Sequence, residues 1–153
     1  MTIIRHDIFM AQALILARQA AAKGEVPVGA LVIDGQGDVV GQGANATESG
    51  HTALAHAEMI ALKRASEKLG RWRLQDCTLY VTLEPCPMCA GAMVQSQLGT
   101  LVFGAPDNKA GAAGSLFNIT HSPLLNHRIT VIGGILEQPC AQLLQDFFKC
   151  RRN

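Results

Sequence analysis

The chain has 153 residues, a length typical of one domain, so we expect a single domain over residues 1–153. Hydrophobic residues make up 48% of the chain and charged residues 16%, which excludes an intrinsically disordered protein. The formal net charge of +1 excludes a strongly basic protein that coats nucleic acid through bulk charge, although it leaves room for a local basic patch.

The N-terminal region contains an apolar stretch, residues 8–17, that resembles the core of a signal peptide. Its polar neighbours fall within one sector of a helical wheel, however, which indicates a mostly buried helix with one polar stripe. No stretch reaches the ~18 apolar residues of a membrane span. The five cysteines are irregularly spaced and do not form the paired framework of a small secreted domain. We therefore expect a soluble, cytoplasmic protein with no membrane partner.

Helix and strand patterns alternate along the chain. A helix is expected over residues 7–23, followed by a hairpin with strands over 28–34 and near 39–40. Glycines at positions 35, 37 and 41 also invite a dinucleotide-loop interpretation, but their spacing departs from G-x-G-x-x-G and no helix follows, which favours a hairpin turn. Further on, helices are expected over 54–69, 86–97 and 141–149, and strands over 78–82, 100–103 and 128–132.

This order of elements predicts an α/β fold, a three-layer α/β/α sandwich. Residues 104–127 form a long stretch rich in Gly, Ala, Asn and His, between two predicted strands. Loops of that length in a compact domain are usually functional, so we expect this one to border a site or to act as a lid.

Two short motifs lie at the predicted starts of two helices. One is His56-x-Glu58 and the other is Pro85-Cys86-x-x-Cys89. Taken alone, a histidine near a helix start is often a capping or hydrogen-bonded residue, and a C-x-x-C pair can be redox-active. Together and in this order they match the H-x-E…P-C-x-x-C signature of the zinc deaminases.

The spacing of the motifs suits a metal centre. Residues three apart on a helix share one face, so Cys86 and Cys89 can both bind one zinc ion, and a helix N-terminus favours their thiolate form. His56 would be the third ligand. Three protein ligands leave the fourth position open for water, which is typical of a catalytic zinc site. His51, in a loop-like segment, is the other nearby candidate ligand and fits an open site less well.

Glu58 is the carboxylate available beside this metal. We expect Glu58 to take a proton from the metal-activated water and to pass it to a ring nitrogen of the base being deaminated. The alternative is that Glu58 is only a favourable negative charge at a helix start.

Several further segments carry a more specific resemblance. They are 25–30, Asn45, 55–58, 79–93, 103–105, Asp107, Lys109, 111–116, 126–128 and 146–148. Through them nearly the whole chain resembles the bacterial tRNA-specific adenosine deaminases. The chain departs from that pattern at Ala53 and Leu54, where the family usually has Pro-Thr, and at Pro106, where a polar residue is common. These changes concern the rim of the substrate pocket and touch no metal ligand.

The resemblance implies a cytidine-deaminase-like fold with a central mixed five-stranded sheet, one Zn²⁺ per subunit and no organic cofactor. It implies hydrolytic deamination of the wobble adenosine in a tRNA anticodon stem-loop to inosine, by a homodimer, with the base flipped into the zinc pocket.

The resemblance also implies substrate contacts. Asn45 would bond the base or ribose, Val28 would pack on the ring, the Ala57 N–H would contact the base, Asp107 would contact the loop sugar, and Phe148 would line the pocket or stack on a neighbouring nucleotide. From the residues alone, Asn45 could instead be a turn residue and Val28 a core residue. Either Phe147 or Phe148 could face the substrate, since adjacent helix residues point about 100° apart.

Other functions remain open on the sequence. A small-molecule deaminase of the same fold would act on guanine, cytosine or a free nucleoside. A zinc-stabilised, catalytically silent RNA-binding subunit and a thiol-redox protein are two further alternatives, and both leave Glu58 unexplained. The basic C-terminal residues, among them Lys149, Arg151 and Arg152, either contact RNA phosphates or simply satisfy a helix C-terminus.

Overall fold

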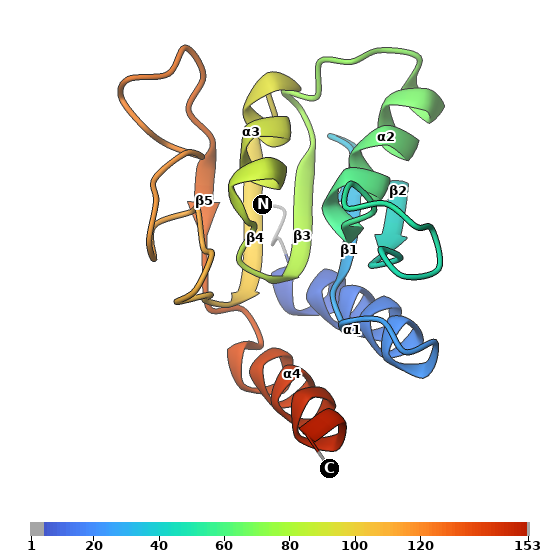
Figure 1. The fold of residues 1–153 in the computed structure, drawn as a ribbon. Coiled ribbons are helices and arrows are strands. Elements are labelled where there is room, and N and C mark those ends of the chain that lie inside the picture. The colour runs from blue at the N-terminus through green and yellow to red at the C-terminus, as the bar shows by residue number, and fades with distance from the viewer. Residues whose placement is uncertain (1–4, 153) are drawn as a thin grey trace.

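A five-stranded mixed sheet forms the middle layer of the protein, whose computed structural model describes residues 5–152 (Figure 1). Its strands are β1 (Gly29–Ile33), β2 (Val39–Ala44), β3 (Thr78–Leu83), β4 (Thr100–Ala105) and β5 (Thr130–Ile132). They lie in the order β2-β1-β3-β4-β5. β1 pairs antiparallel with β2 and β3, whereas β3 with β4 and β4 with β5 are parallel. The predicted mixed sheet is therefore confirmed.

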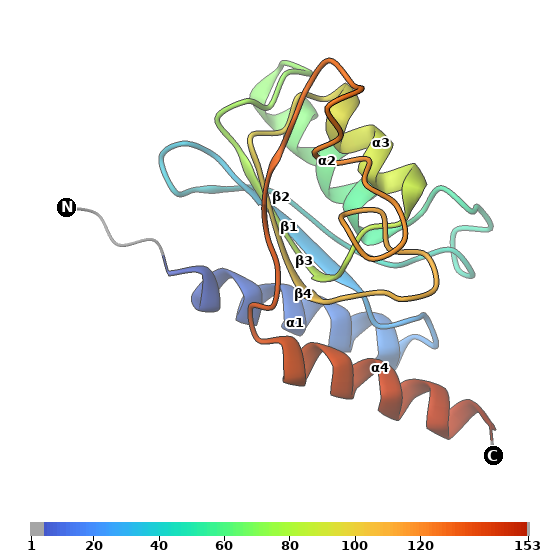
Figure 2. The same cartoon turned by 90° about the vertical axis from the view of Figure 1, so that its left-hand side faces the viewer.

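Two helices cover each face of the sheet (Figure 2). One face carries α1 (His6–Ala22) and α4 (Glu137–Arg152), and the other carries α2 (Ala57–Leu69) and α3 (Pro87–Gln95). This arrangement confirms the predicted α/β/α sandwich. Within residues 5–152, no helix is long and apolar enough to cross a membrane.

The side chains of alternate strand residues belong to two separate hydrophobic cores. Leu31 and Tyr80 join the core beneath α1 and α4, whereas Val32 and Leu79 join the core beneath α2 and α3. Neighbouring residues of a strand point to opposite faces, so this alternation follows directly from the pleat. All five residues of β1 are buried, as expected for a strand inside a sheet that is covered on both sides.

The starts of α2 and α3 meet at one edge of the sheet. α3 begins immediately after Cys86, just beyond the carboxyl end of β3, and α2 begins immediately after His56, beyond the loop that follows β2. The loop that follows β4 leaves the sheet at this same edge, because β3 and β4 are parallel. Sites in open α/β sheets commonly lie beyond the carboxyl ends of the strands.

Several predicted boundaries are wrong: β4 ends at Ala105 rather than at 103, β5 begins at Thr130 rather than at 128, α3 ends at Gln95 rather than at 97, and α4 ends at Arg152 rather than at 149. Three further boundaries have a clear physical reason. α2 begins at Ala57 rather than at position 54, because His56 has an extended backbone (φ −77°, ψ 148°) and is the N-cap. α4 begins at Glu137 rather than at 141, since Pro139 lies in its first turn, where a proline is tolerated. β2 continues to Ala44, well past the predicted segment near 39–40.

Glycines explain why β2 was underestimated. A Cβ added at Gly41 would lie 2.7 Å from the Ala65 nitrogen, and one added at Gly43 would lie 2.7 Å from the Ala57 oxygen. Glycine weakens a strand pattern, yet it allows another backbone to approach closely. These two glycines let the backbone of α2 lie directly on the sheet beside the site.

Gly29→Ala is expected to lower the free energy of unfolding by about 1–3 kcal/mol, the usual cost of overpacking. A Cβ at Gly29 would meet the Ala13 carbonyl oxygen and lie 2.6 Å from the Ala17 nitrogen. These are backbone atoms of α1, so the whole helix would have to shift. Urea unfolding measures the change. In the control Gly35→Ala, the nearest contact of the new Cβ is 3.4 Å, and a change below about 0.5 kcal/mol is expected. Equal stability of the two variants would contradict this prediction.

Candidate metal and catalytic site

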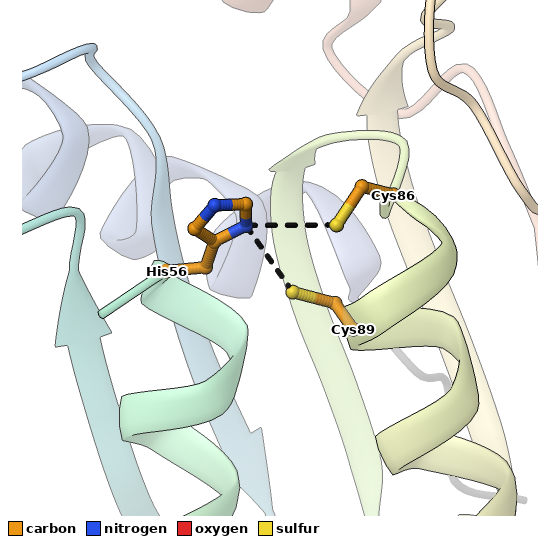
Figure 3. A group of neighbouring side chains, drawn as sticks. All are labelled: His56, Cys86 and Cys89. Atoms are coloured by element: carbon orange, nitrogen blue, oxygen red, sulfur yellow. Dashed lines mark hydrogen bonds between the residues drawn. The ribbon is translucent and has the colours of Figure 1, made fainter. Parts of the chain in front are cut away.

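His56, Cys86 and Cys89 come together between the starts of α2 and α3 (Figure 3). Their ligand atoms all lie within 4.8 Å of one another. His56 Nδ1 is 3.6 Å from Cys86 Sγ and 3.5 Å from Cys89 Sγ. His56 and Cys86 are both N-cap residues with extended backbones, whereas Cys89 is a buried residue of the first turn of α3. The three predicted ligands therefore share one site.

The spacing of these atoms fits a zinc ion. A Zn–N bond of about 2.0–2.1 Å and a Zn–S bond of about 2.3 Å at a tetrahedral angle place nitrogen and sulfur about 3.6 Å apart. Both observed N···S distances agree with that value. One imidazole and two thiolates form a donor set that suits zinc. His51 is exposed and lies outside the group.

The electrostatics of the group favour one thiolate before any metal binds. A hydrogen bond from Cys89 lowers the pKa of Cys86 to about 4, and His56 contributes in the same direction. The same hydrogen bond, together with burial, raises the pKa of Cys89. The hydrogen bond to Cys86 raises the pKa of His56. Cys86 is therefore prepared to bind a cation, and Cys89 must lose its proton on metal binding.

Glu58 is buried in the first turn of α2, with 4% of its surface exposed. Burial raises the pKa of Glu58 from 4.5 to about 7, against the opposing effect of its own backbone N–H. Nearby Cys89 and His56 also act to lower the pKa of Glu58, but burial outweighs them. A carboxyl group that titrates near neutral pH can both accept and return a proton. Such a carboxyl group beside a candidate metal site can serve as a general acid and base.

Asn45, Ala57 and Val28 adjoin the start of α2. The Ala57 N–H donates to Asn45 Oδ1 at 2.8 Å, and the Asn45 N–H donates to the Val28 carbonyl oxygen at 3.1 Å. One of the two lone pairs of the Asn45 amide oxygen is thus engaged, and the amide nitrogen is a donor that Asn45 can offer to a ligand. Val28 is buried in the same core cluster as Ala57 and Cys89.

Asp107 and Phe148 line one cavity of about 470 Å³, which also has Val26 and Leu83 in its wall. Phe148 is 43% exposed. Phe147 instead lies under the guanidinium of Arg151, 4.5 Å from the ring centre. Of the two adjacent phenylalanines, Phe148 is therefore the one beside Asp107.

Of the basic C-terminal residues, Arg151 contacts the protein itself. Arg151 donates to the Gly24 carbonyl oxygen in addition to covering Phe147. The guanidinium of Arg151 therefore has a structural role between α1 and α4. Lys149 is exposed.

Sequence reasoning missed Glu84, which is 2% exposed yet carries no cationic partner in its hydrogen bonds. It accepts from the backbone N–H groups of Asp107 (3.0 Å), Ala113 (2.9 Å) and Ser115 (3.1 Å), and from the Ser115 hydroxyl. Burial acts to raise the pKa of Glu84, but these hydrogen bonds outweigh it and hold the pKa below its ordinary value. A glutamate directly after an apolar strand and before Pro85 was the available signal.

Glu25 is a second missed residue of the same kind. It is 1% exposed and accepts from the backbone N–H groups of Glu48 (3.1 Å) and Ser49 (2.8 Å), which hold its pKa below the ordinary value. Glu25 thereby fixes the loop between β2 and α2, which leads to His56.

The sandwich fold, the His-Cys-Cys group and the buried glutamate together define a deaminase of the cytidine-deaminase-like class. Residues 4–152 match the family of MafB19-like deaminases. The tRNA-specific adenosine deaminase of Bacillus subtilis (strain 168) is 43% identical over 145 residues, which cover 95% of this chain and 89% of that protein.

Solved structures agree with the sequence relatives. One, from a study of A-to-I editing by tRNA:A34 deaminases at the wobble position of transfer RNA, is 39% identical with a TM-score of 0.85, covering 90% of this chain and 99% of its own. A guanine deaminase from Nitrosomonas europaea is 27% identical with a TM-score of 0.80, covering 98% and 88%. The chain belongs to the family of tRNA-specific adenosine deaminases.

Proposed function

We propose that the protein is a zinc-dependent hydrolase that converts adenosine to inosine at the wobble position of a tRNA anticodon loop. The observation that carries the proposal is the His56, Cys86 and Cys89 group beside buried Glu58. It occurs in a chain that is 43% identical to a tRNA-specific adenosine deaminase over most of both lengths.

In the proposed reaction, Glu58 accepts a proton from the attacking water at its carboxylate oxygen. It then returns that proton to the ring nitrogen of the base, and a further proton transfer lets the amino group leave as ammonia. Zinc, which His56, Cys86 and Cys89 would hold, would supply a Lewis acid and so make water a better nucleophile at neutral pH. The near-neutral pKa of Glu58 suits a group that must work in both directions.

The positions of the side chains support the proposed substrate contacts. A flipped adenine would receive a hydrogen bond from the Asn45 amide nitrogen and would pack near Val28. The Ala57 N–H already donates to Asn45 Oδ1. Asp107 and Phe148 share one cavity wall, where a loop sugar and a neighbouring base would fit. A hydrogen bond from the Ala57 N–H to the base would require Asn45 Oδ1 to release it.

The test is inosine formation on an anticodon stem-loop with adenosine at the wobble position, run in parallel with guanine, cytidine and free adenosine. Conversion of the stem-loop alone is the expected result. Ammonia release from guanine alone would favour the second candidate, a small-molecule deaminase. The 27% identity to a guanine deaminase supports that candidate. Tight stem-loop binding without ammonia release would indicate a silent RNA-binding protein.

We further propose that the enzyme is a cytoplasmic homodimer. Four large apolar side chains are exposed on the loop that follows β4, which is a common feature of surfaces that bind another protein: Leu116, Phe117, Leu124 and Leu125. The five cysteines are all free thiols, as a reducing compartment maintains them. Light scattering of the purified chain tests the dimer, and a monomer at micromolar concentration would contradict it.

A further inference from the structure

We propose that Glu84 is a positioning residue that shapes the loop of residues 107–115 for the anticodon loop and so controls RNA binding rather than proton transfer. The inference rests on the proposed function, because Asp107 in this loop is the residue that would contact the RNA sugar. Glu84 itself is buried and reaches the substrate only through the loop.

One carboxylate ties both ends of this loop together. Oε1 of Glu84 accepts from the Asp107 N–H at 3.0 Å and from the Ser115 hydroxyl. Oε2 accepts from the Ala113 N–H at 2.9 Å and from the Ser115 N–H at 3.1 Å. A carboxylate offers about four lone-pair sites. The four donors use this capacity in full, so this single side chain joins Asp107 at the start of the loop to Ala113 and Ser115 at its end.

The same loop is joined to the backbone next to the metal ligands. The Glu84 N–H donates to the Ala105 oxygen at 2.8 Å, and the Ala112 N–H donates to the Pro85 oxygen at 2.8 Å. Gly111 lies against the carboxyl group, where an added Cβ would be 2.5 Å from Glu84 Cδ. Since Cys86 follows Pro85 directly, Glu84 couples the segment that carries a metal ligand to the segment that carries Asp107.

The orientation of Asp107 depends on that shape. Its Oδ1 accepts from the N–H groups of Lys109 (2.9 Å) and Ala110 (3.2 Å), so the side chain is held by the turn that it begins. If the loop loses Glu84, RNA binding must order the loop again, and the entropy of that ordering weakens binding. Glu58 lies on α2 and has no hydrogen bond to this loop among the described contacts, so the chemical step should be spared.

The experiment measures kinetics of Glu84→Gln on the wobble-adenosine stem-loop. Glutamine keeps the shape of the side chain but turns an amide NH₂ toward the N–H donors, which leaves buried donors without acceptors. We expect KM to rise about tenfold, kcat to change less than about twofold, and zinc to remain at one per chain. Ser115→Ala removes a single donor at an exposed residue and should raise KM about threefold. Should Glu84→Gln fail to fold, Ser115→Ala carries the same test.

A double-mutant cycle separates positioning from general structural support. If Glu84 acts by placing Asp107, then Glu84→Gln combined with Asp107→Ala has the same KM as Asp107→Ala alone. The matched control is Glu25→Gln, which removes a buried carboxylate that holds a different loop. Its effect on KM should multiply with that of Asp107→Ala.

Two outcomes would overturn the inference while the wild type is active on the stem-loop. One is an unchanged KM in Glu84→Gln and Ser115→Ala. The other is a KM effect that multiplies with that of Asp107→Ala. A wild type that is inactive on the stem-loop contradicts the proposed function and the inference together, so the two failures are distinguishable.

Discussion

Glu58→Gln is expected to lower kcat for inosine formation by about 10³-fold, within the 10²–10⁴ range of a positioned acid–base group, while the chain keeps its zinc. Glutamine has the volume of glutamate and fits the same buried space, but it cannot accept or return a proton. Glu58 is not one of the three ligands, so metal content should equal that of the wild type. Single-turnover rates on the stem-loop and zinc analysis of the same preparation measure both quantities.

Glu67→Gln is the matched control for this prediction. Glu67 lies on the same helix, is exposed, and makes only a 3.9 Å ion pair with Lys63. Exposed pairs of this kind contribute little, so wild-type rate and stability are expected. A zinc-loaded Glu58→Gln enzyme that turns over at near the wild-type rate would remove Glu58 from the mechanism. Loss of zinc in Glu58→Gln would instead show that Glu58 supports the metal ligands.

The candidate metal-binding group was predictable from sequence because its geometry is local. Cys86 and Cys89 are three residues apart on one helix start, and His56 and Glu58 are two residues apart on another. Such spacings define which side chains can share a face without knowledge of the remaining fold. The two helix starts meet because the strands pair over long distances in the chain. The expectation that they meet came from the family resemblance.

The loops around the site were not predictable in the same way. Glu84 binds residues 23 to 31 positions further along the chain, and Glu25 binds residues 23 and 24 positions away. No periodicity or short motif reports such a contact. Charge in an apolar context marks a residue as unusual, but only the folded chain shows which N–H groups surround it. The length of β2 was underestimated for a related reason. Gly41 and Gly43 weaken the strand pattern, and only the folded chain shows that they allow the backbone of α2 to approach closely.

Cys89→Ala is expected to lose zinc and inosine formation together. Apparent zinc-binding free energies of about 10–16 kcal/mol, shared among the ligands of a site, imply that losing one thiolate weakens affinity by about 10²-fold or more. Cys89 is fully buried, so no exposed group can take its place. The thermal midpoint of the wild type should fall toward that of Cys89→Ala when a chelator is added, because ligand binding stabilises the folded state.

The pH dependence of zinc affinity gives a second, independent test of Cys89 as a ligand. The pKa of Cys89 is raised in the metal-free chain, so zinc must displace its proton, and zinc affinity should fall as the pH is lowered. Cys150→Ser is the matched control, since Cys150 is exposed and lies outside the ligand group; it should keep zinc, activity and pH dependence. Full zinc occupancy in Cys89→Ala would contradict its role as a ligand. Inosine formation by a zinc-free wild type would contradict the metal dependence itself, because the Glu58 carboxyl group would then activate water unaided.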